Sequence, residues 1–224
     1  MLKEVTKVNL SLPVYQNWMA LRQRAIDTAH IHLTIPNYVV FSWINKVENG
    51  EDKIDHEAEA RAAEVIFHAF PGIEPDYVLA IANSGLSFGR AVKKLYPKAQ
   101  FLEATKLEEP ENHEVGFNYV TAHSYSRETD FDFKLPNIPK GKRVLIIDDV
   151  AAHGGVGKPI AEAVQKMGGE VVGYSVYFDK AFQEGLKKIS RELGILCFSV
   201  IRILQINHDN ITLMDEASSL QLIQ

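Results

Sequence analysis

Residues 144–159 of this 224-residue chain read VLIIDDVAAHGGVGKP. The four apolar residues at the start have the pattern of a buried strand, and two carboxylates, Asp148 and Asp149, follow them directly. A glycine-rich turn comes next. Pro159 then stands in the expected first turn of a helix, where a missing N–H is tolerated. The stretch therefore predicts a strand, a loop and a helix in succession, which is the repeating unit of α/β folds.

The turn after the strand combines three glycines with the two preceding acids. Gly154, Gly155 and Gly157 allow backbone N–H groups to close around an anion, and the N-terminus of the following helix adds a favourable dipole. Carboxylates repel a phosphate, so we expect Asp148 and Asp149 to bind sugar hydroxyls or a magnesium ion beside it. The segment thus predicts a phosphate site, with carboxylates beside it for sugar hydroxyls or a magnesium ion.

Two common phosphate-binding motifs do not fit this segment. A Walker loop would require glycine at the position of Ala152 and Ser or Thr at the position of Pro159. The dinucleotide fingerprint would require a third glycine after Gly155 and Gly157, at a position that Ile160 occupies. Neither a P-loop nor a dinucleotide-binding turn is therefore expected.

Further strand and helix patterns lie on both sides of this segment. Besides the helix after Pro159, the expected helices are 14–30, 55–70 and 86–95; the expected strands are 38–44, 77–81, 99–103 and 171–178. Their alternation predicts an α/β fold with a mainly parallel, twisted sheet flanked by helices. Residues 106–141 are too long for an ordinary connection, and we expect a flexible flap there, with an extra hairpin as the alternative.

Composition excludes several classes of protein. Asp and Glu number 29 against 24 Lys and Arg, a formal net charge of −5, which argues against a nucleic-acid partner. The single cysteine, Cys197, rules out an intramolecular disulfide or a multi-cysteine metal site; its apolar neighbours predict burial. No apolar run approaches the roughly 20 residues of a membrane helix, and no secretory signal pattern is present. We therefore expect a cytoplasmic protein.

The segment 144–159 resembles the phosphoribosyl pyrophosphate (PRPP) signature of type I phosphoribosyltransferases, in which apolar residues, two acids and a glycine-rich turn follow one another. The family's turn usually carries hydroxyl residues, and this chain lacks them there, so the backbone amides remain to hold the 5′-phosphate. Other parts of the chain resemble the xanthine phosphoribosyltransferase branch of bacterial purine salvage. These parts are 39–54, 82–85, 103–106, 123–129, 177–182 and 200–203.

The resemblance implies an N-terminal extension and base-binding hood at 1–55, then a PRPP-binding α/β core at 56–224 with its flap at 106–141. It implies a purine phosphoribosyltransferase that transfers the 5-phosphoribosyl group of PRPP to a 6-oxopurine, xanthine-like in preference, with Mg²⁺ as cofactor, and a homodimer. Adenine or orotate specificity, or a non-catalytic PRPP-sensing regulator, are the alternatives. The leading ~35 residues are too short for a winged helix and are not basic, which disfavours the regulator.

The resemblance also implies a role for each site residue. The catalytic residues are Asp148, Asp149 and Arg127, and the two acids are the implied metal ligands as well. The PRPP-binding residues are Asn83, Ser84, Gly85, Lys106, Ser124, Tyr125, Ala152, His153, Gly154, Gly155 and Val156. The base-binding residues are Tyr38, Asn45 and Lys180, whose ammonium would donate to a 6-oxo group. Asn83 and Thr105 depart from the pattern, because related enzymes commonly have Glu and Arg there.

Overall fold

The computed structural model describes residues 6–32, 37–41, 43, 54–108, 114–124 and 129–224. Its helices are α1 (Leu12–Thr28), α2 (His56–Ala69), α3 (Gly85–Lys94), α4 (Gly157–Lys166), α5 (Gly185–Leu193) and α6 (Glu216–Ser219), with a short 3₁₀ turn, η1 (Ala181–Gln183). Its strands are β1 (Ala29–Ile31), β2 (Val39–Phe41), β3 (Tyr77–Ile81), β4 (Gln100–Lys106), β5 (Phe117–Ser124), β6 (Thr129–Pro136), β7 (Arg143–Ala151), β8 (Glu170–Lys180), β9 (Cys197–Ile206) and β10 (Ile211–Leu213).

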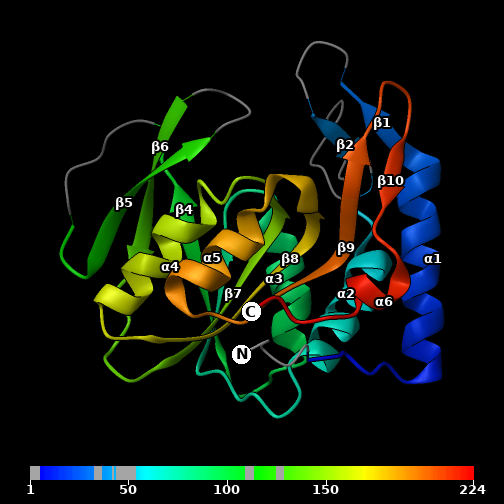
Figure 1. The fold of residues 1–224 in the computed structure, drawn as a ribbon. Coiled ribbons are helices and arrows are strands. Elements are labelled where there is room, and N and C mark those ends of the chain that lie inside the picture. Colours follow the sequence, from blue (N-terminus) through cyan, green and yellow to red (C-terminus); the bar gives the residue numbers. More distant parts are fainter. Residues whose placement is uncertain (1–5, 33–36, 42, 44–53, 109–113, 125–128) are drawn as a thin grey trace.

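The main sheet of the described part has the order β10-β9-β8-β7-β3-β4-β6-β5 (Figure 1). Its centre, from β9 to β4, is parallel throughout, and antiparallel strands are added at both edges. β1 and β2 form a separate antiparallel pair. The predicted α/β fold with a mainly parallel sheet is confirmed.

The order of the central strands determines where a ligand site forms. From β3 the chain goes to β4 on one side, and from β7 it goes to β8 on the other. Connections that leave two neighbouring strands in opposite directions open a crevice beyond the carboxyl ends of those strands. The pairing of β3 with β7 stops at Ala80 and Ile147, whereas β7 continues beside β8 to Ala151. The crevice therefore lies beside Asp148 and Asp149.

β7 and β8 extend further than the sequence pattern predicts, as does β4, which runs to Lys106 instead of residue 103. We expect the strand before the acidic pair to end at Ile147, but β7 runs on through both acids to Ala151. We place Lys180 just after a strand, but it is the last residue of β8. The pattern underestimates these strands because their ends carry polar residues, which hydrophobic periodicity does not count.

Helices cover both faces of the sheet. α2 and α3 pack together on one face, with α1 outside them, and α4 and α5 pack together on the other (Figure 1). Successive side chains of a strand point to opposite faces. Accordingly Leu145 and Ile147 join the core under α2 and α3, while Val144 and Ile146 join the core under α4 and α5.

The N-terminal helix α1 packs into the first of these cores. Its fully buried Trp18 donates a hydrogen bond through Nε1 to the carbonyl oxygen of Val200, at 2.7 Å. Arg22 donates to the carbonyl oxygen of Met214, at 2.7 Å. α1 is thereby joined to β9 and to the segment after β10. None of the helices in the described part combines the length and the apolar character needed to cross a membrane.

Much of the expected flap at 106–141 consists of the antiparallel hairpin β5–β6, paired from Phe117 with Pro136 to Ser124 with Thr129. β6 also pairs with the end of β4, through Thr105 and Lys106, so the hairpin extends the main sheet. The alternative of an extra hairpin thus describes these residues. The tip at 125–128, which contains Tyr125 and Arg127, lies outside the described residues, and its role as a flap stays a prediction.

Candidate active site

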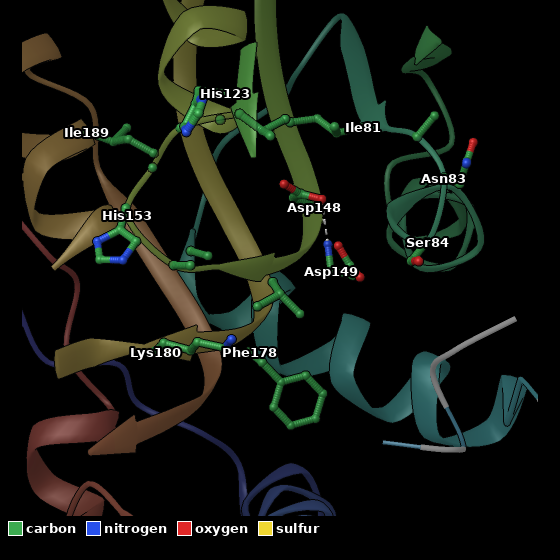
Figure 2. Close-up of a pocket in the computed structure, with 18 of the residues that line it drawn as sticks. Ile81, Asn83, Ser84, His123, Asp148, Asp149, His153, Phe178, Lys180 and Ile189 are labelled. Atoms are coloured by element: carbon green, nitrogen blue, oxygen red, sulfur yellow. Dashed lines mark hydrogen bonds between the residues drawn. The ribbon is translucent and has the colours of Figure 1, made fainter. Parts of the chain in front are cut away.

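A cavity of about 320 Å³ opens at the carboxyl ends of β3, β7 and β8 (Figure 2). Most of the predicted site residues line it, from five separate parts of the chain. They are Tyr38, Asn83, Ser84, Lys106, Asp148, Asp149, Ala152, His153, Gly154, Gly155, Val156 and Lys180. The sheet therefore brings together residues that are as much as 142 positions apart in sequence.

The two acids stand at the centre of this cavity. Asp148 is 7% exposed, and its Oδ1 accepts a hydrogen bond from the backbone N–H of Asp149 at 2.9 Å (Figure 2). Burial raises the pKa of Asp148 well above its usual range, and the neighbouring charge of Asp149 raises it further. Burial also raises the pKa of Asp149, against a hydrogen bond from Ser84 that lowers it. Two desolvated carboxyl groups this close favour a ligand that brings positive charge or hydroxyl donors.

The predicted phosphate loop, residues 152–156, joins β7 to α4. Gly154 has a φ of 79°, a conformation that suits glycine, and its carbonyl oxygen accepts the N–H of Lys158 at 3.1 Å. On its outer side the loop lies against α5, because a Cβ on Gly185 would be 2.7 Å from the nitrogen of Gly154. His153 lines both the cavity and a neighbouring surface groove over α5. The loop is thus a closely supported turn at a helix N-terminus, the geometry expected of an anion site.

The turn after β3 faces the acidic pair. Asn83 and Ser84 line the cavity, and the peptide between Ala82 and Asn83 is cis. Gly85 does not line the cavity but lies behind it, where a Cβ would be 3.1 Å from the Cα of Asp148. Gly85 is therefore a close-packing residue, since only a residue without a side chain lets α3 start so near to β7.

The end of the cavity where base binding is predicted is aromatic, with a buried cation, Lys180. Lys180 is 7% exposed; its Nζ donates to the carbonyl oxygen of Asn37 at 2.7 Å and lies 5.3 Å from the centre of the Tyr38 ring. Burial lowers the pKa of Lys180 to about 8, and the charge of Asp149 opposes that shift. Tyr38 and Lys180 are thus together, as predicted, while Asn45 lies outside the described residues.

Sequence reasoning missed two phenylalanines here. Phe178 stacks on Phe41, with ring centres 4.1 Å apart, and both rings line the cavity beside Lys180. The available signal was that both residues fall in apolar segments predicted as strands, 38–44 and 171–178. Such a local pattern does not show that two segments so far apart in sequence meet.

Lys106 and His123 mark the side of the cavity toward the hairpin. Lys106 ends β4, and its Nζ lies 3.1 Å from the centre of the Phe131 ring. His123, which sequence reasoning did not select, lines the cavity with its Nδ1 2.7 Å from Oδ1 of Asp130. Its position as the first residue of the segment 123–129, within the expected flap, was the available signal. Ser124 is the last residue of β5, where its backbone pairs with Thr129.

Metal ligands from the protein are few. Within the described ranges, no group of three or more His, Cys, Asp or Glu side chains could hold a metal ion. Asp148 and Asp149 offer carboxylate oxygens, the donors that Mg²⁺ prefers. Mg²⁺ commonly takes one or two carboxylates and completes its shell with substrate phosphates and water. The donor set fits a magnesium ion shared with a phosphorylated substrate.

Comparisons with known proteins agree with this geometry. The xanthine phosphoribosyltransferase 1 of Clostridium perfringens is 30% identical over 128 residues, which are 56% of this chain and 66%, just under two thirds, of that protein. The adenine phosphoribosyltransferase of Flavobacterium johnsoniae is 33% identical over 136 residues, 59% of this chain and 76% of that protein. The crystal structure of the adenine phosphoribosyltransferase of Rhodothermus marinus superposes with a TM-score of 0.63 at 19% identity, covering 84% of this chain and 99% of that one.

The family model of the phosphoribosyl transferase domain matches residues 50–194, well over half of the chain. The matched range includes the acidic pair, the phosphate loop, the turn after β3 and Lys180. The chain therefore belongs to the phosphoribosyl transferase domain family.

Proposed function

We propose that this chain is a purine phosphoribosyltransferase, which transfers the 5-phosphoribosyl group of PRPP to a purine base and releases pyrophosphate. One observation carries the proposal: a phosphate loop, an acidic pair and a buried lysine among aromatic rings line the same cavity of about 320 Å³. The loop suits the 5′-phosphate of PRPP, the acidic pair suits its ribose, and the lysine among aromatic rings suits the purine base. The family match and the names of the relatives support it.

The cavity suggests how PRPP is held. The 5′-phosphate lies on the backbone amides of residues 152–156, at the N-terminus of α4. The ribose hydroxyls face Asp148 and Asp149, and the pyrophosphate faces the turn of Asn83 and Ser84. Lys106 lies at the same side of the cavity and supplies positive charge to the pyrophosphate.

Magnesium fits beside the acidic pair, with Asp148 and Asp149 as its protein ligands. When bound, the ion neutralises charge on the departing pyrophosphate. The chain's own residues do the rest: they align the base with C1 of the ribose and keep water away from the activated sugar. We assign the closing of the site to the flap with Ser124, Tyr125 and Arg127.

In the transfer itself, one bond forms and one breaks at C1 of the ribose. A ring nitrogen of the purine forms the new bond to C1, while the bond from C1 to the pyrophosphate oxygen breaks and that oxygen takes the electron pair. The proton of the attacking nitrogen passes to the released pyrophosphate, so that charge and atoms balance. Preorganised amides and cations around the leaving group favour this step, since they need no reorganisation as its charge develops.

We propose that the favoured base is a 6-oxopurine, xanthine-like, because the Lys180 ammonium faces the aromatic end of the cavity. A charged donor binds an oxo oxygen but has no acceptor in the 6-amino group of adenine. Tyr38 and Phe178 make this end of the cavity aromatic, and Asn45 would contribute its amide. The xanthine phosphoribosyltransferase of Clostridium supports this preference. Adenine remains the second candidate, because the relative in Flavobacterium is named an adenine phosphoribosyltransferase.

The proposal is tested by measuring pyrophosphate release from PRPP and Mg²⁺ with xanthine, hypoxanthine, guanine, adenine and orotate in turn. We expect kcat/KM to be higher for the oxopurines than for adenine by on the order of ten- to a hundredfold. A best rate with adenine would reassign the base. Binding of PRPP without transfer to any base would instead favour the PRPP-sensing regulator. We further propose a cytoplasmic homodimer.

A further inference from the structure

Tyr174 is a buried polar residue that lines the candidate cavity. It lies on β8 and is 1% exposed, within the core under α4 and α5. Its hydroxyl donates a long hydrogen bond, 3.3 Å, to Oδ2 of Asp148. The other oxygen of that carboxyl group already accepts the N–H of Asp149. A donor therefore contacts each oxygen of the Asp148 carboxyl group, and together they hold its plane in one orientation.

The same ring also supports the beginning of α4. A Cβ built on Gly157 would be 2.6 Å from Cζ of Tyr174 and would overlap its hydroxyl. Gly157 is the first residue of α4 and follows the phosphate loop directly. The helix thus starts in direct contact with the Tyr174 hydroxyl, and the position of that hydroxyl sets how closely the loop approaches the sheet.

One side chain therefore contacts both parts of the PRPP site. The distance between the ribose-binding carboxylate and the phosphate loop must match the span of the ribose 5-phosphate. Tyr174 lies between the two, and its burial prevents the hydroxyl from moving to another partner. A residue placed in this way positions the binding groups without itself binding substrate.

We infer that Tyr174 is a positioning residue for PRPP, which fixes Asp148 and the start of α4 relative to each other. The inference rests on the proposed function only in naming PRPP as the ligand. It assigns no contact between Tyr174 and the base, since Lys180 and Tyr38 lie at the other end of the cavity.

The test is the substitution Tyr174→Phe, which removes the hydroxyl and leaves the ring. The matched control is Tyr177→Phe, on the same strand and also 1% exposed. The hydroxyl of Tyr177 donates to the carbonyl oxygen of Ala58, at 3.2 Å, in the opposite core. The two variants thus lose a buried hydroxyl with a similar hydrogen bond, but only the Tyr174 hydroxyl contacts the acidic pair.

We expect Tyr174→Phe to raise the Kd for PRPP with Mg²⁺, measured by calorimetry, on the order of three- to tenfold. The KM for PRPP should rise by a similar factor while the KM for the base stays unchanged. Tyr177→Phe should lower the melting temperature to a similar extent and bind PRPP as the wild type does. An unchanged Kd in Tyr174→Phe, or an equal loss in both variants, would overturn the inference.

A second variant covers the case in which Tyr174→Phe fails to fold. Gly157→Ala places a methyl group against the Tyr174 hydroxyl from the other side and should also weaken PRPP binding without raising the KM for the base. Wild-type affinity in that variant would contradict the inference. Because calorimetry with PRPP alone needs no turnover, the outcome is separate from the proposed reaction. A wild type that binds PRPP but transfers it to no base overturns the reaction and leaves the inference testable.

Discussion

We expect the buried charge of Lys180 to destabilise the fold, while under the proposed function it selects oxopurines over adenine. The substitution Lys180→Met tests both effects. The ammonium is 7% exposed and has one described hydrogen bond, to the carbonyl oxygen of Asn37 at 2.7 Å. Burial lowers its pKa from 10.5 to about 8. That difference corresponds to roughly 3 kcal/mol of unfavourable free energy for keeping the charge in the folded state. Replacing Lys180 by Met removes this unfavourable free energy, but it also removes the hydrogen bond to Asn37, which costs about 1 kcal/mol of stability.

The pH dependence follows from the same pKa. Below about pH 8 both the folded and the unfolded chain carry the Lys180 proton, so the full cost is present. Between about pH 8 and 10.5 the unfolded chain keeps the proton while the folded chain loses it, so the destabilising contribution of Lys180 shrinks as pH rises. Lys180→Met should therefore be more stable than the wild type by about 1–2 kcal/mol at pH 7. The advantage should disappear toward pH 10.5.

Urea unfolding followed by tryptophan fluorescence, at pH 7 and at pH 10, measures these differences. Lys187→Met is the control, because Lys187 is exposed on α5 and pairs with Glu184 at 3.0 Å. It should change stability by less than about 0.5 kcal/mol at either pH. The same Lys180→Met protein should lose most of its preference for oxopurines over adenine. If Lys180→Met is less stable than the wild type at pH 7, or if its advantage over the wild type does not shrink between pH 7 and pH 10, the reasoning is wrong.

Three further predictions concern the PRPP site and the assembly. Asp149→Asn removes a charge and keeps the shape, so calorimetry should show weaker PRPP binding; unchanged affinity would refute the assignment of the acidic pair. Gly85→Ala places a Cβ 3.2 Å from Oδ1 of Asp148 and should raise the KM for PRPP more than that for the base, whereas an equal rise in both would contradict its close-packing role. Sedimentation at micromolar concentration should show a dimer, and a 25.2 kDa species would disprove it.

The sequence by itself predicts those features that arise within a short stretch of chain. The strand, acidic pair, glycine turn and helix of residues 144–159 form one local unit, and their residue types specify its chemistry. The helix expected from residue 55 is confirmed as α2, whose N-cap Asp55 accepts the N–H groups of Glu57 and Ala58. Alternating strands and helices suffice to predict the α/β class, because hydrophobic periodicity is a local property.

Only the tertiary structure decides which of these units meet. The hydrogen bond from Lys180 to Asn37 joins residues 143 positions apart, and the stacking of Phe41 on Phe178 depends on the same approach of distant segments. Tyr174 looks like an ordinary apolar strand residue in the sequence, yet its hydroxyl contacts Asp148. Strand order and register result from packing summed over the whole sheet, and one residue of slip would turn each of these side chains to the opposite face. The residue types that define the site can therefore be read from short segments of the sequence, whereas their arrangement in space depends on the complete fold.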